Sequence, residues 1–213
     1  MISIIDYNAG NLTSVKRAMD YLGKESVITD DYSEIINSEK IIFPGVGAAG
    51  RAIADLKKRK LDQAIIEAFQ NNKPILGICL GTQIIMEMSE ENDTECIGII
   101  KGRVKRFICD LDKPEGIRLK VPHMGWNTVR LKRNHPVFQG VDRDDEFYFV
   151  HSYYPVPDDP DTILGETEYI TRFASVLATG SLVAMQFHPE KSGEPGLKIL
   201  ANFSEWDGKD YVE

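Results

Sequence analysis

Short apolar runs alternate with segments of helical periodicity through the first 90 residues, and this alternation most limits the folds open to the chain. Each run is apolar enough to be buried on both faces, as the strands of a parallel sheet are. The expected strands cover residues 2–5, 26–29, 41–43 and 74–79, and the expected helices cover residues 12–22, 51–71 and 80–88. Strands that alternate with helices indicate a parallel sheet covered on both sides.

The second half of the chain differs, because short strand candidates follow one another with turn residues between them. They cover residues 102–107, 127–131, 146–150, 163–166, 175–178 and 182–187, with turn signals at 112–116 and 157–161 and a helix expected over 196–203. We therefore expect an α/β fold in which a central, mainly parallel sheet is flanked by helices and has an antiparallel extension. We expect one domain over residues 1–213, with its site at the carboxyl ends of the parallel strands.

The charge balance argues against nucleic acid and anionic membranes as main partners. The chain has 25 Lys and Arg against 33 Asp and Glu, a net charge of −8, whereas those partners need a positive field. No run approaches the roughly 20 apolar residues of a membrane span. Asp6 interrupts the N-terminal apolar run before a signal peptide could form. A cytoplasmic location is therefore expected.

Three cysteines, Cys79, Cys96 and Cys109, stand in the chain with no CxxC spacing. An odd number without that spacing argues against a disulfide framework and against a structural zinc site. In a reducing compartment each cysteine is then either buried packing or part of the chemistry. The residues around each one have to decide between these two readings.

The stretch around Cys79 has the pattern of a nucleophile elbow. Gly77 and Gly81 flank Cys79 at the point where an expected strand turns into an expected helix, and a side chain at either glycine would crowd so sharp a turn. The helix N-terminus favours the thiolate, and the backbone N–H of Leu80 is free to stabilise an oxyanion. A buried cysteine packed between glycines, or the nucleophile of another α/β hydrolase, would also fit this stretch alone.

A cysteine nucleophile needs a base and a group that orients the base. Among four histidines, His188 follows an expected strand of the same sheet, and Glu190 stands two residues later. Val46 and Gly47 follow another expected strand, so their backbone N–H groups are candidates to complete the oxyanion hole. A strand-end histidine and a plain strand-to-helix turn are the simpler readings. A phosphate loop is disfavoured, because neither GxGxxG nor GxxxxGK[ST] is present.

These residues together resemble the class I, triad-type glutamine amidotransferases. Residues 77–83 resemble the GxCxGxQ nucleophile motif of that family, and residues 186–190 resemble its FHPE motif. Within the family, the glutaminase subunits of imidazole glycerol phosphate synthases are the most similar. That further likeness rests on residues 5–12, 44–47, 122–127 and 187–193. The resemblance runs from Met1 to about Phe203.

The resemblance implies a division of labour between two subunits. This chain would hydrolyse L-glutamine to glutamate and ammonia through Cys79, His188 and Glu190, with no cofactor and no metal. A separate cyclase subunit, a TIM barrel in a heterodimer with this chain, would use the ammonia. It would make imidazole glycerol phosphate and aminoimidazole carboxamide ribotide in histidine biosynthesis.

The resemblance also assigns residues that would hold the glutamine. Gln83 lies one helical turn beyond the elbow and is expected to face the pocket, and Glu91 is expected near the α-amino group of the substrate. The segment of His151, Ser152 and Tyr153 is expected to hold the backbone groups of the substrate. A solvated acidic cap is the simpler interpretation of Glu91, and a strand end with aromatic packing is that of the His151 segment.

The string from residue 122 to residue 127 is expected to be a loop at the cyclase interface. Trp126 between glycine and asparagine reads as a large exposed anchor, which interfaces favour, and Met124 and Asn127 accompany it. A tryptophan in the core is the alternative. Two departures from the family are Asn8-Ala9, where glycine-rich sequence is expected, and the tail of residues 204–213, which has no clear counterpart.

Three other functions stay open on the sequence. The same glutaminase chemistry could supply ammonia to an enzyme that modifies surface sugars. The chain could be a non-catalytic binding module that kept the fold, although the complete set of Cys79, His188 and Glu190 argues against this. A general cysteine hydrolase is the third alternative.

Overall fold

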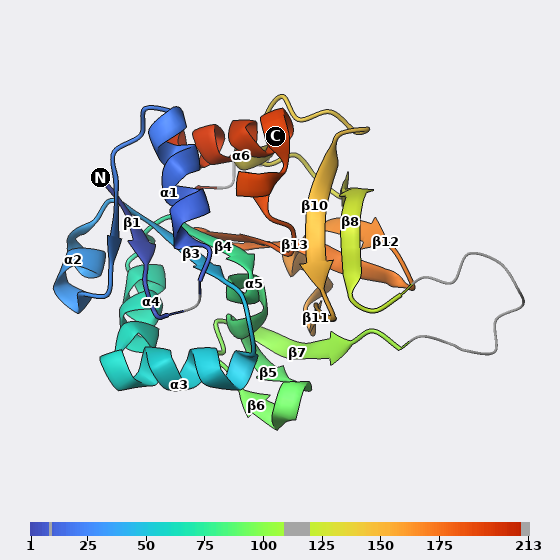
Figure 1. Ribbon diagram of the computed structural model, residues 1–213, viewed down its shortest axis with the longest axis horizontal. Helices are drawn as coiled ribbons and strands as arrows, with labels where there is room; N and C mark the ends of the chain where they lie inside the picture. The colour runs from blue at the N-terminus through green and yellow to red at the C-terminus, as the bar shows by residue number, and fades with distance from the viewer. Residues whose placement is uncertain (9, 109–119, 210–213) are drawn as a thin grey trace, which may run out of the picture.

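The computed structural model describes residues 1–8, 10–108 and 120–209, and its largest element is an eight-stranded sheet (Figure 1). The strands follow one another across this sheet in the order β2 (Ser26–Thr29), β1 (Ile2–Ile5), β3 (Lys40–Gly45), β4 (Ile75–Cys79), β14 (Leu182–Met185), β13 (Arg172–Thr179), β12 (Ile163–Glu168) and β9 (Arg130–Leu131). Neighbours from β2 to β14 pair in parallel, and neighbours from β14 to β9 pair antiparallel. The expected parallel sheet with an antiparallel extension is confirmed.

Helices cover both faces of the parallel half, as the apolar runs predict. Helices α1 (Leu12–Tyr21) and α6 (Gly193–Glu205) lie on one face, and α2 (Tyr32–Asn37), α3 (Ala49–Arg59) and α4 (Leu61–Gln70) lie on the other (Figure 1). Side chains alternate between the two cores along β3, since Ile42 packs with α1 and α6 while Ile41 and Phe43 pack with α3 and α4. Burial on both faces explains why these strands read as continuous apolar runs.

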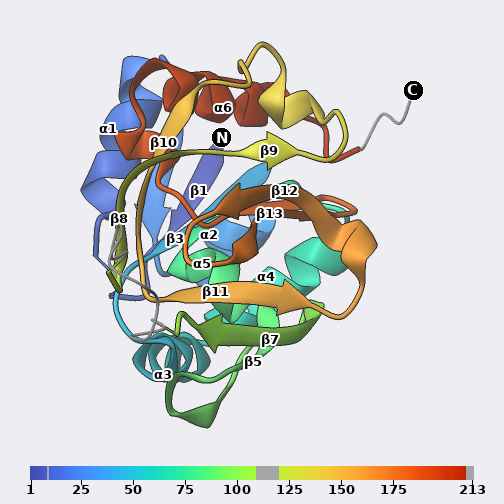
Figure 2. The same cartoon turned by 90° about the vertical axis from the view of Figure 1, so that its right-hand side faces the viewer.

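Two smaller sheets stand beside the large one (Figure 2). One is a pair, β8 (His123–Thr128) with β10 (Glu146–His151). The other has the order β11 (Tyr153–Pro157), β7 (Ile100–Arg106), β5 (Met86–Ser89) and β6 (Thr94–Glu95). Short helical turns complete the described elements: α5 (Leu80–Ile84), η1 (Glu91–Asp93), η2 (Pro136–Phe138), η3 (Pro160–Thr162) and η4 (Pro189–Lys191).

The helix expected over residues 80–88 is wrong in its second half. Helix α5 ends at Ile84, and Met86–Ser89 form β5, which pairs in parallel with β7 and antiparallel with β6. Strand pairing with distant residues therefore outweighs the helical spacing of the apolar side chains. The strand expected over 182–187 ends earlier, at Met185, and the helix expected over 196–203 is longer, as α6.

The segment expected as one or two helices over residues 51–71 is two helices. Lys60 separates α3 from α4 with a left-handed backbone of φ 59°. The string 122–127 is not the expected loop, because β8 begins at His123. The turn expected at 112–116 and Cys109 lie outside the described residues.

Among the described elements with no counterpart in the expectations are α2 and β11. Asp31 caps α2 by accepting a hydrogen bond from the backbone N–H of Glu34 at 2.9 Å, which is an ordinary helix start. Strand β11 contains Pro155 and Pro157, which argue against a strand, yet it lies at the edge of its sheet where proline is tolerated.

The first part of the C-terminal tail belongs to the core. Trp206 is buried against Phe203 beside α6, and its indole N–H donates to the carbonyl of Lys209 at 2.8 Å. Lys40 on β3 also donates to the carbonyl of Trp206. No helix among the described residues is both long and apolar enough to cross a membrane.

Candidate active site

Cys79 stands at the sharp turn from β4 into α5, with φ 53° and ψ −104°. This backbone conformation is rare for a residue with a side chain, and such strain collects at functional sites. A Cβ atom added to Gly81 would lie 2.0 Å from the carbonyl oxygen of Phe43, and one added to Gly77 would lie 2.9 Å from the Cβ of Ala184. The neighbouring strands β3 and β14 therefore demand both flanking glycines, as the elbow pattern predicts.

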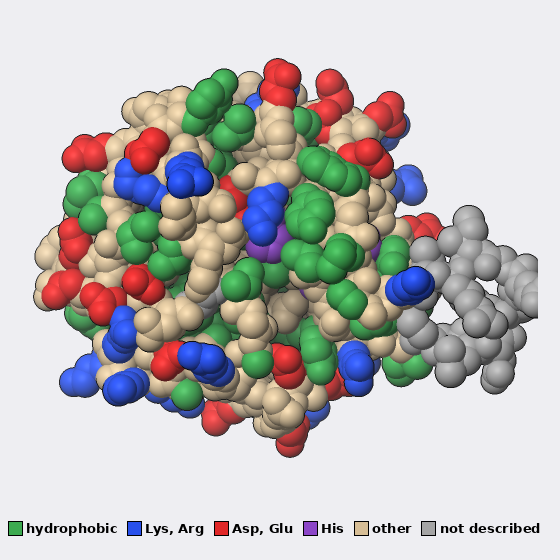
Figure 3. Space-filling view, in the orientation of Figure 1, with side chains coloured by type: hydrophobic (Ala, Val, Ile, Leu, Met, Phe, Trp, Pro, Cys, Tyr) green, Lys and Arg blue, Asp and Glu red, His purple; other side chains and the backbone are tan. Residues whose placement is uncertain are grey.

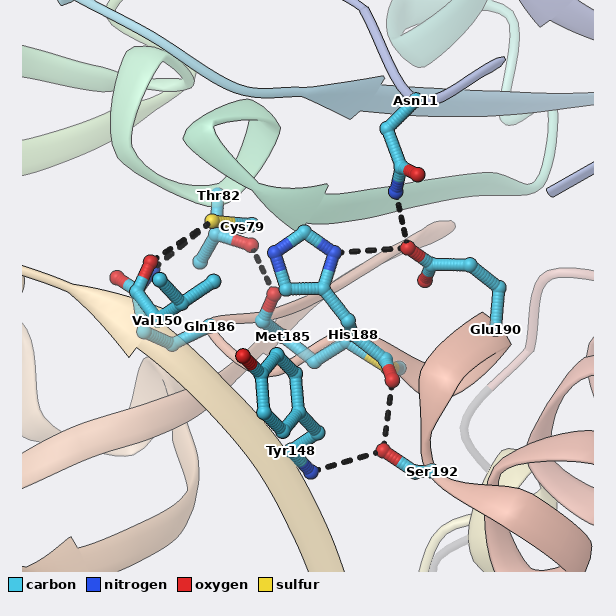
Figure 4. A network of polar contacts seen from close by, with 10 residues as sticks. All are labelled: Asn11, Cys79, Thr82, Tyr148, Val150, Met185, Gln186, His188, Glu190 and Ser192. Atoms are coloured by element: carbon cyan, nitrogen blue, oxygen red, sulfur yellow. Dashed lines mark hydrogen bonds and ion pairs between the residues drawn. The ribbon is translucent and has the colours of Figure 1, made fainter. Parts of the chain in front are cut away.

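His188 and Glu190 follow β14, the strand next to β4, and are held by their own backbone contacts. The His188 N–H donates to the carbonyl of Tyr148 at 2.9 Å, and the His188 carbonyl accepts from the Ser192 hydroxyl at 2.6 Å. The Nδ1 atom of His188 lies 2.8 Å from Oε1 of Glu190, and both side chains are buried. Figure 4 shows the imidazole between Glu190 and Cys79, with one ring nitrogen toward each.

The charge of His188 is governed by its two neighbours. Burial opposes the charged form, but the interactions with Cys79 and Glu190 outweigh burial and raise the pKa of His188 to about 10. The ring is therefore protonated at neutral pH beside the cysteine. Apart from Cys79, its buried Nε2 atom has no hydrogen-bond partner among the described residues, which leaves it available to exchange a proton with the sulfur or a leaving group.

Two amide side chains complete this arrangement, and neither was assigned a role from the sequence. The amide of Asn11 donates to Oε1 of Glu190 at 2.5 Å, and Nε2 of Gln186 lies 3.8 Å from Sγ of Cys79 (Figure 4). Asn11 directly precedes the first residue of α1 and has a left-handed φ of 64°. Both residues lie in segments that carry the family resemblance. Their position in those segments was the sequence signal that could have identified them.

The turn expected to complete the oxyanion hole lies beside the nucleophile. Gly45 at the end of β3 pairs with Cys79, and Val46 and Gly47 follow directly, with φ 103° at Gly47. Glycine is favoured at position 45, because a Cβ atom there would lie 1.9 Å from the hydroxyl oxygen of the buried Tyr7 and 3.2 Å from the Cβ of Leu80. The oxyanion role of Leu80, Val46 and Gly47 stays a prediction that this placement supports.

Gln83 is buried, and both hydrogens of its amide are used within the protein. It donates to the carbonyl of Tyr153 at 3.0 Å and to Oε1 of Gln186 at 3.1 Å. Glu91 in η1 accepts a hydrogen bond at 2.6 Å from the N–H of Ala49, the first residue of α3. Glu91 is thus tied to the segment that follows the oxyanion turn rather than standing as a free acidic cap.

The segment of His151, Ser152 and Tyr153 connects β10 to β11 next to the nucleophile. The carbonyl of Val150, just before this segment, lies 4.0 Å from Sγ of Cys79. The carbonyl of Ser152 accepts from the N–H of Phe107 at 3.0 Å. The structure therefore brings this segment to the site, and its contact with substrate stays a prediction.

The three residues expected at an interface lie on β8. Met124 is 62% exposed and Trp126 is 53% exposed, so the expected exposure of Trp126 is confirmed although the residue stands on a strand. Its role as an interface anchor stays a prediction. Trp126 lies against Tyr148 of β10 with ring centroids 6.0 Å apart. Asn127 is half-buried. Figure 3 shows hydrophobic side chains gathered on the surface over β8 and β10.

Comparison with known proteins decides the family. Residues 3–206 match the family model described as glutamine amidotransferase class-I. The chain belongs to the class I glutamine amidotransferase family. Two of the most similar amidotransferase relatives are each named imidazole glycerol phosphate synthase subunit HisH. The protein from Maridesulfovibrio salexigens is 48% identical over 97% of both chains, and that from Neisseria meningitidis is 46% identical over 96% of this chain and 99% of the relative.

Solved structures support the same amidotransferase fold at lower identity. PurLQS from Thermotoga maritima matches with a TM-score of 0.70 and 19% identity, covering 96% of this chain and 97% of that one. The glutaminase domain of CTPS from Trypanosoma brucei matches with a TM-score of 0.60 and 19% identity, covering 99% of this chain and 95% of that one. Within this amidotransferase fold, a cysteine on an elbow with a buried His–Glu pair beside it can perform nucleophilic acyl transfer.

Proposed function

We propose that this chain is the glutaminase subunit of an imidazole glycerol phosphate synthase and acts as a single amidotransferase domain. The observation that carries the proposal is the strained elbow of Cys79 beside the buried His188–Glu190 pair. The printed names of relatives at 46–48% identity supply the choice of synthase within the family.

Hydrolysis proceeds in two halves. The sulfur of Cys79 attacks the side-chain amide carbon of glutamine, and His188 transfers a proton to the departing ammonia. Water then attacks the thioester, with His188 as the base, and releases glutamate. The N–H groups of Leu80, Val46 and Gly47 stabilise the oxyanion, and loss of one such donor typically costs roughly 10²–10³ in rate.

Binding of the substrate uses the groups around the elbow. Glu91 pairs with the α-amino group of glutamine, and the segment from His151 to Tyr153 holds its backbone groups. Gln83 forms the floor of this pocket, held there because its amide Nε2 donates to the carbonyl of Tyr153 and to Oε1 of Gln186. No cofactor or metal enters these steps.

The ammonia passes to a cyclase subunit, a TIM barrel that forms a heterodimer with this chain. Met124, Trp126 and Asn127 on β8 form the contact surface, which the exposure of the two large side chains supports. The proposed setting is the cytoplasm, where a thiol nucleophile stays reduced.

Glutaminase assays with and without the co-purified partner test the proposal. We expect feeble glutamine hydrolysis by the purified chain, a sharp rise with the cyclase subunit and its nucleotide ligand, and no activity in Cys79→Ala. Complementation of a histidine auxotroph separates this function from ammonia supply to a sugar-modifying enzyme. Full glutamine-dependent activity in Cys79→Ala would show that the mechanism is wrong.

A further inference from the structure

Two buried histidines that take no part in the triad, His123 on β8 and His151 at the end of β10, lie next to each other near the active site. His123 is 2% exposed and His151 is 5% exposed, and Nδ1 of His123 lies 3.1 Å from Nε2 of His151. The His123 ring stacks between Phe149 and Tyr169, with centroid distances of 4.7 Å and 3.9 Å. Neither histidine is needed for attack on the amide, so the hydrogen bond between the two buried rings needs another explanation.

The acceptor at one end sets the direction of every hydrogen bond in this pair. Nδ1 of His151 lies 2.8 Å from the carbonyl oxygen of Tyr153, which can only accept, so Nδ1 carries the proton. Nε2 of His151 is then an acceptor, and Nδ1 of His123 must donate to it. Both rings must be neutral for this, and burial lowers the pKa of His123 to about 4 and that of His151 to about 3.

Asn127 on β8 closes the outer end of the chain of hydrogen bonds. Its Nδ2 lies 3.4 Å from Nε2 of His123 and donates to the carbonyl of Glu168 at 3.0 Å. Its Oδ1 accepts from the N–H of Thr128 at 2.9 Å, so one donor contact and one acceptor contact determine the orientation of the amide. Asn127 therefore donates inward to His123.

The inner end of the chain reaches the nucleophile. The carbonyl of Tyr153 accepts a second hydrogen bond, from Nε2 of Gln83, which also donates to Oε1 of Gln186. Gln186 is thereby turned so that its Nε2 faces Sγ of Cys79 at 3.8 Å. The carbonyl of Tyr153 is thus held from two sides, by His151 and by Gln83.

We propose that His123 and His151 are positioning residues that form a one-way hydrogen-bond relay from Asn127, on the surface strand β8, to the carbonyl of Tyr153 at the floor of the glutamine pocket. The inference rests on the proposed glutaminase function. The relay holds the segment from His151 to Tyr153 and the amides of Gln83 and Gln186 in the orientation that recognises glutamine. Displacement of β8 by a partner would reach the pocket through the same bonds.

The substitution Asn127→Asp tests the direction of the relay. Aspartate keeps the acceptor for Thr128 but cannot donate, so Nε2 of His123 must carry a proton, which reverses or charges the histidine pair. In ¹⁵N spectra of the full-length chain at neutral pH, we expect His123 and His151 as Nδ1–H tautomers, and we expect this pattern to be lost in Asn127→Asp. Nε2–H tautomers in the unsubstituted chain would overturn the proposal.

Labelling of Cys79 tests the positioning role. We expect Asn127→Asp and His123→Phe, which keeps the ring stack, to slow labelling by a diazo-ketone analogue of glutamine about tenfold, because each leaves a buried polar group unsatisfied. Labelling by iodoacetamide, which needs no glutamine pocket, is expected to change less than about twofold.

Two control variants accompany these tests. Tyr169→Phe keeps the stack and the relay, and Asn134→Asp makes the same charge change at an exposed site. Both are expected to label as the unsubstituted chain does.

The outcomes separate the relay from the glutaminase function. Equal analogue labelling in Asn127→Asp, His123→Phe and the controls would overturn the relay while leaving the function intact. An equal loss with iodoacetamide would also overturn it, because the effect would then be on the thiol and not on recognition. No labelling of the unsubstituted chain by the glutamine analogue would instead count against the function, and the tautomers would still test the relay.

Discussion

Asn11 combines two properties at one position, a left-handed backbone and a side-chain amide that donates to the carboxylate of Glu190. Asn11→Gly keeps the backbone and removes the amide, so we expect glutaminase activity to fall about tenfold, since a hydrogen bond to a charged group contributes about 1.5 kcal/mol or more. Asn11→Asp is nearly isosteric but places a second carboxylate beside Glu190, so we expect a larger loss.

Steady-state kinetics with the partner present measure the effect of both substitutions. A lower kcat with little change in KM is expected, because Asn11 acts on the orientation of His188 through Glu190 and not on substrate contacts. Equal activities in Asn11→Gly and Asn11→Asp would contradict the role of the amide as a donor.

His123 and His151 also make the stability of the chain depend on acid pH. Their pKa values lie below the unfolded value of about 6.5, at about 4 and about 3. As the pH falls below about 6.5, these histidines bind protons in the unfolded state but not in the folded state. The free energy of unfolding therefore falls. Each histidine contributes up to about 1.4 kcal/mol per pH unit until the pH reaches its folded pKa.

Urea unfolding between pH 7.5 and pH 4.5 measures this dependence. His123→Phe removes one of the two contributions, so its free energy of unfolding is expected to fall less steeply over that window than that of the unsubstituted chain. Parallel curves for the two proteins would show that His123 takes up its proton in the folded state as readily as in the unfolded one.

The elbow between β4 and α5 holds Cys79 in the site. Strand β3 packs against the elbow and limits the size of the side chains that fit there. Gly81→Ala would push a methyl group against the carbonyl of Phe43, 2.0 Å away, so we expect a loss of about 3 kcal/mol or more in the free energy of unfolding. Gly50→Ala is the matched control in helix α3, where the nearest atom is the Thr94 hydroxyl at 3.3 Å. Its stability is expected to stay within about 1 kcal/mol of the parent.

Urea or thermal unfolding of Gly81→Ala and Gly50→Ala distinguishes local crowding from a general intolerance of alanine. A Gly81→Ala protein as stable as Gly50→Ala would mean that β3 can retreat from the elbow, and the steric account of the glycine pattern would be wrong.

Elements were predictable from the sequence where burial alone determines them. Strand β1 agrees residue for residue with the expectation, because it lies inside the parallel half of the sheet and is buried on both faces. Strand β2 at the edge also agrees, although it is mostly half-buried. Strands β5 and β11 were missed because their existence depends on pairing with β7, which no local pattern records. The helical spacing after Cys79 was therefore extended too far.

The same distinction applies to the site. Cys79, His188 and Glu190 stand in short motifs whose residue types carry the chemistry, so they were identified locally. Gln186 and His123 act through partners 107 and 28 residues away in the chain, and only the folded sheet brings those partners together. The roles of such residues require the structure.

At the scale of the whole molecule, the exposed surface of β8 is the place where a partner is expected to act. Trp126 and Met124 are large apolar side chains left more than half exposed by the fold, and such anchors dominate binding at interfaces. We expect Trp126→Ala to weaken binding of the cyclase subunit about 30-fold, equivalent to about 2 kcal/mol. The stability of the isolated chain is expected to change by less than about 1 kcal/mol, because the side chain is largely solvated.

Titration calorimetry of the full chain with the cyclase subunit measures the affinity, and Tyr21→Ala is the matched control. Tyr21 is an aromatic residue that is 79% exposed on α1, which lies apart from β8 in Figure 1. Its removal is expected to leave the affinity unchanged. Equal affinities for Trp126→Ala and Tyr21→Ala would place the partner elsewhere. The partner would then not contact β8, the strand on which the relay from Asn127 starts. A selective loss in Trp126→Ala would place the partner on β8, the strand whose Asn127 begins the proposed relay to the pocket beside Cys79.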